Sequence, residues 1–257
     1  MQEKLKKMAR RFIILTLATG FCAGAPSFAQ PDSSQEISQY IQIMQEGSLA
    51  HKIITVKKIT NSGLSDTQLF DVLEKELKDG FLTATGKDPM DYMAWLCKAL
   101  ASSGQEKYKA TLTHVVDNTP DPKLKRYAEQ SLALFEQYAA RNKIMNQGSA
   151  GMADKDPAVV QLINMLKSDM LELKRDAAKK ITRSTYKDPD LYETVNQELL
   201  NGYANASDKL SVDAMAWLCK ALGSSGNANY KPTLQKVMDS GNPLLVKYAT
   251  QSFEMLY

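Results

Sequence analysis

The feature that most constrains the fold is an internal repeat. Residues 90–117 and 212–239 are identical at 18 of 28 positions without a gap, at an offset of 122 residues. The same offset pairs the KKIT segments at 57–60 and 179–182. Because chance does not keep one register over such a distance, we predict two homologous copies of one module. We place the copies at 30–140 and 157–257, joined by a linker or inter-repeat loop at 141–156.

Apolar side chains recur within each copy at the spacing of an amphipathic helix. In the first copy Ile37, Tyr40, Ile41 and Met44 stand at i, i+3, i+4 and i+7. Asp-Pro pairs precede several such stripes, and this order is typical of a helix N-cap followed by its first turn. Alternation typical of strands is missing from the sequence. The predicted fold class is therefore all-α, with about six antiparallel helical hairpins, three in each copy.

Hairpins this short cannot bury their own apolar faces, so they must stack on their neighbours. Three segments place a basic residue shortly before a small alanine: LKRDAAKKI (173–181), KLKRYAEQSL (123–132) and LLVKYATQSF (244–253). These segments resemble the second helices of HEAT-like repeats, which build armadillo-type α-solenoids. The resemblance covers most of residues 37–257 and implies an extended surface that binds other proteins. Two compact helical bundles on a string are the alternative arrangement.

The first 29 residues have the pattern of a secretory signal peptide. Five basic residues precede an apolar run at 12–21, and small residues at Ser27 and Ala29 follow it. The run is too short for a membrane span, which needs ~20 apolar residues. We therefore expect cleavage after Ala29 and a periplasmic or secreted protein without a membrane span. Removing residues 1–29 takes away five positive charges and one negative charge, so the formal net charge falls from +3 to −1, which argues against nucleic acid as a partner.

The sequence is poor in groups that catalyse reactions or bind metals. His51 and His114 lie on different predicted helices, without a second His or a Cys at ligand spacing. Some HEAT-like enzymes bind iron through His-Glu pairs, and no His-Glu dipeptide occurs here. P-loop, GxGxxG, GxSxG and HExxH patterns are also missing. We therefore predict a protein that is not an enzyme, with no catalytic residue, no metal site and no cofactor.

Two cysteines remain after the predicted cleavage, at equivalent positions of the two copies. Cys97 and Cys219 stand on the apolar stripe of the repeated helix. Three stacked hairpins of ~10 Å each would hold them ~30 Å apart, whereas the Cα atoms of a disulfide lie within ~7 Å. We therefore expect two buried free thiols that pack as small apolar side chains.

The repeated helix also carries the best candidate for a binding surface. At 100° per residue, its charged strip and its tryptophan lie away from the apolar stripe. The candidate binding residues are Asp91, Trp95, Lys98, Asp213, Trp217 and Lys220. A tryptophan beside a charge pair is a common anchor for a partner protein, although the same tryptophan can simply pack between hairpins.

These observations favour an exported, non-catalytic scaffold or adaptor that binds another protein or a peptide. The alternative is an enzyme or a small-ligand-binding protein with a site between the two copies. A cleft that gathers polar side chains from both copies would favour this alternative.

Overall fold

A computed structural model of the chain describes residues 33–148, 152 and 154–256. Within these ranges the chain forms thirteen α-helices, three short 3-10 turns and no strand, which confirms the all-α prediction. The predicted signal peptide and its cleavage position lie outside the described residues. None of the described helices is long and apolar enough to cross a membrane.

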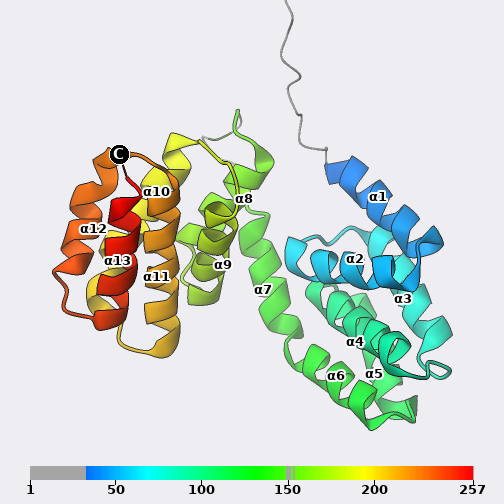
Figure 1. Cartoon of the computed structure of the whole chain (residues 1–257). Coiled ribbons are helices and arrows are strands. Elements are labelled where there is room, and N and C mark those ends of the chain that lie inside the picture. Colours follow the sequence, from blue (N-terminus) through cyan, green and yellow to red (C-terminus); the bar gives the residue numbers. More distant parts are fainter. Residues whose placement is uncertain (1–32, 149–151, 153, 257) are drawn as a thin grey trace, which may run out of the picture.

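The helices fall into two groups of six, which we call the N-terminal half and the C-terminal half, with one further helix between them (Figure 1). The N-terminal half contains α1 (Ser33–Glu46), α2 (Leu49–Ser62), α3 (Thr67–Gly80), α4 (Lys87–Ser102), α5 (Lys109–Asn118) and α6 (Pro122–Ala133). The C-terminal half contains α8 (Pro157–Lys167), α9 (Leu171–Thr182), α10 (Pro189–Gly202), α11 (Lys209–Ser224), α12 (Lys231–Met238) and α13 (Pro243–Glu254). The bridging helix is α7 (Phe135–Met145).

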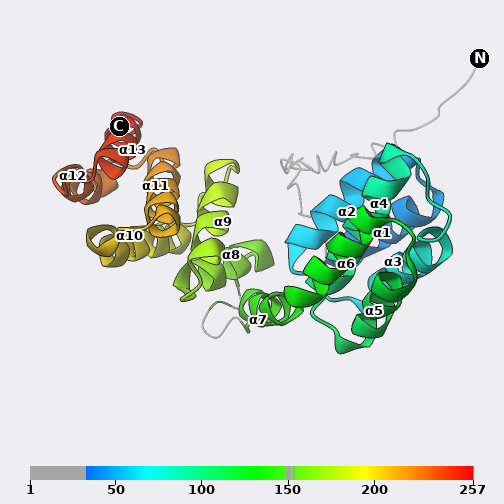
Figure 2. The same ribbon diagram turned by 90° about the horizontal axis from the view of Figure 1, so that it is seen from below.

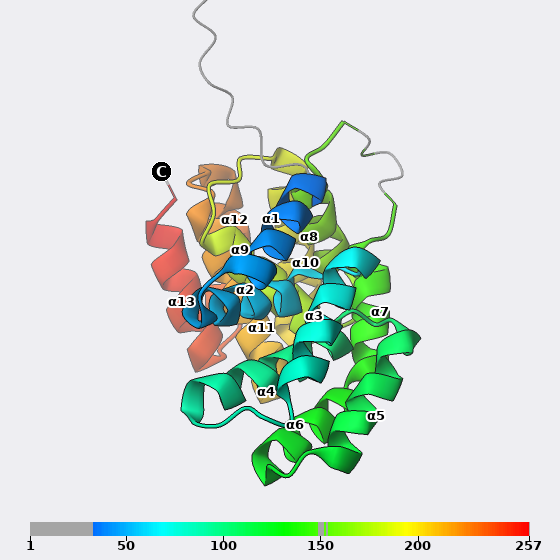
Figure 3. The same cartoon turned by 90° about the vertical axis from the view of Figure 1, so that its right-hand side faces the viewer.

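Consecutive helices pack as hairpins in both halves, and the second helices of the hairpins form a layer. In the N-terminal half α4 packs between α2 and α6, and in the C-terminal half α11 packs between α9 and α13. Figure 3 shows the first of these layers from the side, with α1 and α3 stacked on it. The helix packing fits a helical bundle or a solenoid.

The same polar contacts recur at an offset of 122 residues. Lys52 on α2 pairs with Glu76 on α3 at 3.0 Å, and Lys174 on α9 pairs with Glu198 on α10. Gly80 and Gly202 each leave room for a methionine side chain, because an added Cβ would lie 2.8 Å from Met93 Cε or 2.7 Å from Met215 Sδ. In both halves the Lys–Glu pair thus joins the first hairpin to the second, and the glycine lets the two helices of the second hairpin pack closely.

The hydrophobic core is divided into two clusters. One cluster runs from Met44 to Phe135, and the other runs from Met145 to Leu256. Helix α6 ends at Ala133, and a single turn residue, Leu134, separates it from α7. The break contains neither glycine nor proline, and the apolar side chains of α6 and α7 follow one another with nearly the spacing of a single helix. Helix α7 therefore begins in the first core and ends in the second. Figure 2 shows this helix between the two halves.

Helix α7 is attached to the N-terminal half through backbone carbonyl groups at two helix ends. Asn142 Nδ2 donates to the Ser102 oxygen at 2.7 Å, and Arg141 donates to the Thr60 oxygen at 3.2 Å. Gly63 and Gly104 end the same two helices with φ of 79° and 68°, a conformation that disfavours other residues. An added Cβ at Gly104 would also lie 2.7 Å from Ala139 Cα on α7. These contacts fix α7, so the predicted linker 141–156 starts with five helical residues.

Candidate functional site

A pocket lies in the C-terminal half, where the N-terminal ends of α11 and α13 meet the side of α9. Its volume is about 800 Å³. It is lined by Arg175, Ser207, Asp208, Lys209, Leu210, Val212, Asp213, Ala216, Asn242, Pro243, Leu244 and Tyr248. We call it the C-terminal pocket. It belongs to one half of the molecule and does not lie between the two halves.

Two N-caps place the helix ends that form this pocket. Asp208 accepts hydrogen bonds from the backbone of Leu210 at 2.8 Å and of Ser211 at 3.1 Å, so α11 starts here. Hydrogen bonds from Ser211, first from its hydroxyl and then from its backbone, lower the pKa of the Asp208 carboxyl. Asn242 caps α13 in the same way, and its amide also donates to the Ala206 oxygen at 3.5 Å. The two turns are therefore held side by side.

The pocket wall combines apolar side chains with one loose ion pair. Val212 is buried in the floor, whereas Leu244 is 56% exposed at the rim. Arg175 Nη1 lies 3.9 Å from Asp213 Oδ2, at the outer limit of an ion pair. Its Nε donates to Asp176 at 3.2 Å. The exposed surface of the wall is thus mainly apolar, and its charged side chains are Arg175, Asp208, Lys209 and Asp213.

A second depression occupies the equivalent place in the N-terminal half. It is lined by residues 81, 82, 84–87, 90 and 120–123, and its volume is about 630 Å³. Most of these positions correspond to the C-terminal pocket at the offset of 122, or of 121 after one deleted residue. We call this depression the N-terminal pocket. It does not include Asp91, Ala94 or Tyr127, whose counterparts Asp213, Ala216 and Tyr248 line the C-terminal pocket.

One ion pair accounts for the shorter extent of the N-terminal pocket. Lys123 stands where the C-terminal half has Leu244, and its Nζ lies 2.8 Å from Asp91 Oδ1. The hydrogen bond from Lys123 lowers the pKa of Asp91, and the same bond raises the pKa of Lys123. The pair bridges α4 and α6 and so separates the N-terminal pocket from the face that carries Trp95 and Tyr127.

The structure brings together only part of each predicted binding strip. Lys98 Nζ lies 4.8 Å from the centre of the Trp95 ring, and Lys220 Nζ lies 4.1 Å from the centre of the Trp217 ring. The aspartates pair with other residues, Asp91 with Lys123 and Asp213 with Arg175. Both tryptophans are half-buried and pack against the cores.

Two further cations surround Trp217. Lys179 on α9 and Arg183, the residue that follows α9, lie 5.3 Å and 5.6 Å from the centre of the indole ring. Together with Lys220 they form what we call the cation cluster. Lys220 also lies 4.3 Å from the centre of the Tyr248 ring, which lines the C-terminal pocket. The cation cluster and the pocket are therefore adjacent.

Sequence reasoning missed Arg175, Leu244 and Tyr248. Leu244 and Tyr248 lie in the segment that we compared with HEAT-like helices, and their spacing of four residues places them on one helix face. The sequence signal for the pocket is the pair of positions where the copies differ, since Ile53 and Lys123 occupy the places of Arg175 and Leu244.

The remaining candidates for chemistry are separated from one another. Cys97 and Cys219 are free and buried, as predicted, and burial raises the pKa of each thiol to about 12. His51 and His114 are exposed. Among residues 33–148, 152 and 154–256, no three His, Cys, Asp or Glu side chains gather at metal-binding distance.

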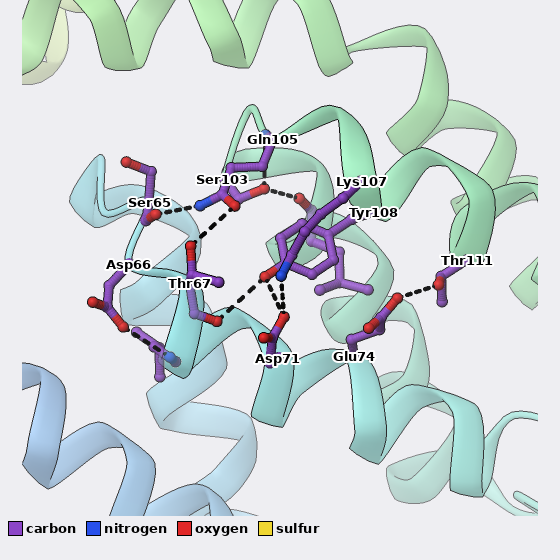
Figure 4. A network of polar contacts seen from close by, with 12 residues as sticks. Ser65, Asp66, Thr67, Asp71, Glu74, Ser103, Gln105, Lys107, Tyr108 and Thr111 are labelled. Carbon is purple, nitrogen blue, oxygen red and sulfur yellow. Dashed lines mark hydrogen bonds and ion pairs between the residues drawn. The ribbon is translucent and has the colours of Figure 1, made fainter.

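A network of polar side chains joins α3 to the start of α5 (Figure 4). Tyr108 Oη donates to Asp71 at 2.8 Å, Lys107 also pairs with Asp71, and Thr111 donates to Glu74. The hydrogen bond from Lys107 is the main cause of the lowered pKa of Asp71. Burial, followed by the bond to Asp71, raises the pKa of Tyr108. These groups satisfy one another across two hairpins, so the network is structural.

No protein-family model matches the chain, and no curated protein is significantly similar to it. Among solved structures, the chain is similar to human deoxyhypusine hydroxylase in complex with glycerol, at 13% identity and a TM-score of 0.32. The match covers 85% of this chain and 83% of the other chain.

This comparison contradicts the predicted function. We expected a non-catalytic scaffold for protein–protein interaction, and the matched structure is that of an enzyme. The prediction failed because it relied on catalytic motifs, which one sequence need not display, and on a resemblance to HEAT-like repeats, a fold that serves several functions. A TM-score of 0.32 does not assign a reaction, a substrate or a cofactor to this chain.

Proposed function

We propose that the chain binds a small, mainly apolar molecule in the C-terminal pocket. The observation that carries this proposal is the pocket itself, with about 800 Å³ of space in front of Val212, Leu244 and Tyr248. Sites for small molecules commonly measure 300–1,000 Å³ and combine an apolar lining with a few polar groups. Arg175 and Asp213 supply these polar groups.

The exposed apolar rim supports the same proposal. Leu244 is one of the large apolar side chains that the fold leaves more than half exposed. The equivalent position in the N-terminal half is Lys123, so the fold tolerates a polar residue at this position. Leu82 is equally exposed beside the N-terminal pocket, so the difference between the pockets lies at the position of Leu244 and Lys123, where the larger pocket has an apolar side chain that a ligand can contact.

The test uses N-phenyl-1-naphthylamine, a neutral probe whose fluorescence rises in apolar surroundings. We expect saturable binding of one probe per chain. Leu244→Lys introduces the residue of the N-terminal half, and the new amine can pair with Asp213 across the pocket. We expect affinity to fall about tenfold or more, which corresponds to ~1.4 kcal/mol.

The matched control is Leu244→Met, which keeps an apolar side chain of similar volume and should keep the affinity within about twofold. Melting curves followed by circular dichroism show whether both variants fold. The proposal fails if the folded Leu244→Lys protein binds the probe as well as the parent, or if the parent does not bind it at all.

We further propose that the chain is an exported HEAT-like solenoid whose halves are homologous copies. The recurrent Lys–Glu pair at the offset of 122 supports homology, and the basic and then apolar pattern of residues 1–29 supports export. Sequencing the N-terminus of the protein recovered from a bacterial periplasm tests the export proposal, with Gln30 as the expected first residue.

A further inference from the structure

We infer that the ligand of the C-terminal pocket is an acidic amphiphile, and that its anionic group binds the cation cluster around Trp217. This inference rests on the proposed function, because it names the chemical class of the molecule in the same pocket. It assigns a role to Lys179, Arg183 and Lys220.

Three positively charged side chains lie around the Trp217 ring. All three cations lie within 5.6 Å of the centre of one indole ring. In the described part of the chain, none of the three forms an ion pair with a carboxylate. The negative face of an indole attracts a cation only weakly at an exposed site. An anionic group bound beside Trp217 would therefore be attracted by all three cations.

The cation cluster lies next to the C-terminal pocket. Lys220 lies 4.1 Å from the Trp217 ring centre and 4.3 Å from the Tyr248 ring centre, so it stands between the two rings. The Tyr248 ring lines the pocket together with Leu244. Lys220 does not line the pocket itself, but it lies beside a ring that does, so a molecule packed against Tyr248 can extend a charged group toward Lys220.

The carboxylates nearest to the pocket do not cancel this positive charge. Asp208 is occupied as the N-cap of α11, where it accepts two backbone hydrogen bonds and one from the Ser211 hydroxyl. Asp213 faces Arg175 at 3.9 Å. Asp208 is thus stabilised by the N-terminal end of α11 and Asp213 faces Arg175, and neither carboxylate forms an ion pair with a member of the cation cluster.

The N-terminal half lacks this arrangement. There, Lys57 and Lys98 lie 5.2 Å and 4.8 Å from the Trp95 ring centre, and Asn61 stands at the position of Arg183. The Asp91–Lys123 pair also separates this ring from the N-terminal pocket. Only the C-terminal half thus combines a third cation, Arg183, with a tryptophan that lies next to a pocket.

The experiment compares two probes that share one apolar body. 1-Anilinonaphthalene-8-sulfonate is N-phenyl-1-naphthylamine with an added sulfonate. We expect the sulfonate probe to bind about fivefold tighter in 20 mM NaCl and to lose this advantage in 500 mM NaCl, because salt screens exposed charges. The neutral probe should bind equally at both salt concentrations or slightly tighter in high salt.

Arg183→Asn, which introduces the residue of the N-terminal half, assigns the effect to the cluster. It should weaken the sulfonate probe about threefold and leave the neutral probe unchanged. Lys57→Gln removes one cation beside Trp95 and serves as the matched control, with both affinities unchanged.

The outcomes separate this inference from the proposed function. If the neutral probe binds and the sulfonate probe binds no tighter, the acidic class of ligand is wrong and the apolar pocket stands. If Arg183→Asn weakens both probes equally, the cluster acts on the fold and the inference is overturned. If neither probe binds the parent protein, the proposed function fails as well. The salt titration requires no variant, so it decides the question even where a variant does not fold.

Discussion

The N-terminal and C-terminal pockets have the same framework and different walls. In both, a turn before the repeated helix faces the N-cap of the last helix of the half. Lys123 crosses to Asp91 in one half, whereas Leu244 leaves Asp213 to a loose contact with Arg175 in the other. The repeated scaffold thus provides two equivalent places, and a few side chains decide which of them extends to the aromatic face.

The two pockets differ although the helices that begin at them have the same lengths. Helices α4 and α11 match in length, as do α6 and α13, and each half keeps its tyrosine at the equivalent position, Tyr127 or Tyr248. An ion pair between exposed side chains contributes little to stability, so replacing it with a leucine costs the fold little. A binding site can therefore be gained or lost in this framework without rebuilding a core.

The largest expected effect is the gain of a second site. Lys123→Leu removes the cation that crosses to Asp91, so the N-terminal pocket should extend to Tyr127. We expect the number of bound N-phenyl-1-naphthylamine molecules to rise from one to two per chain, as measured by fluorescence titration at known protein concentration.

Lys125→Leu is the control for this experiment, because it makes the same substitution two residues away on an exposed part of α6. It should leave the stoichiometry at one. A stoichiometry of one for Lys123→Leu as well would show that the ion pair is not what limits the N-terminal pocket.

A smaller effect compares the two tryptophans directly. Trp95→Phe leaves Trp217 as the only indole of the chain, and Trp217→Phe leaves Trp95. The tryptophan fluorescence of each variant is quenched with iodide, an anion, and with neutral acrylamide. The ratio of the two quenching constants reports how strongly the surroundings of the indole attract an anion. Because three cations surround Trp217 and two surround Trp95, we expect a ratio about twofold higher for Trp217 in low salt. Equal ratios would remove the electrostatic distinction between the halves.

The smallest effect concerns pH. The hydrogen bond from Lys123 holds the pKa of Asp91 below its ordinary value. The pair therefore raises the free energy of unfolding when the pH is above ~3.9, the pKa of an aspartate in the unfolded chain. This contribution disappears as the pH falls through the lower pKa of Asp91 in the folded state. Asp91→Asn should lower the melting temperature by about a degree at pH 7 and by nothing at pH 2.

Asp213→Asn is the comparison for this measurement, because its nearest cation is 3.9 Å away. Calorimetric melting at both pH values should show a smaller change for this variant. A larger loss at pH 7 for Asp213→Asn than for Asp91→Asn would contradict the assignment of the tighter pair to the N-terminal half.

Much of the fold follows from local signals in the sequence. Asp156, Asp188 and Asp121 each precede a proline and each cap a helix, because a short carboxylate reaches the free backbone N–H groups of the first turn. The break at Leu134 could not be predicted, since a single non-helical residue without glycine or proline leaves the apolar spacing almost unchanged. As a result, the bridging helix α7 was missed.

The candidate site was less predictable, because it depends on pairs that are distant in the sequence. Helical spacing places Asp213, Trp217 and Lys220 on one face, but it does not show that Arg175 comes from another helix to face Asp213. Leu244 is unremarkable in its own helix, and its importance appears only when Lys123 is seen to cross to Asp91 in the other half. The site thus emerges from a difference between the halves, whereas the sequence emphasised their likeness.

The attachment of α7 has a mechanical consequence. One end of this helix is fixed to the N-terminal half by Arg141 and Asn142, which bond to carbonyl oxygens at the ends of α2 and α4. Its other end enters the second core through Met145. This end is also tied to α2, because Asn146 Nδ2 donates to the Gly63 oxygen at 3.1 Å and Gln161 Nε2 on α8 donates to the Ser62 oxygen at 3.4 Å. Hydrogen bonds from both sides of the joint therefore end on the last turn of α2, so we expect the halves to resist separation first at this turn.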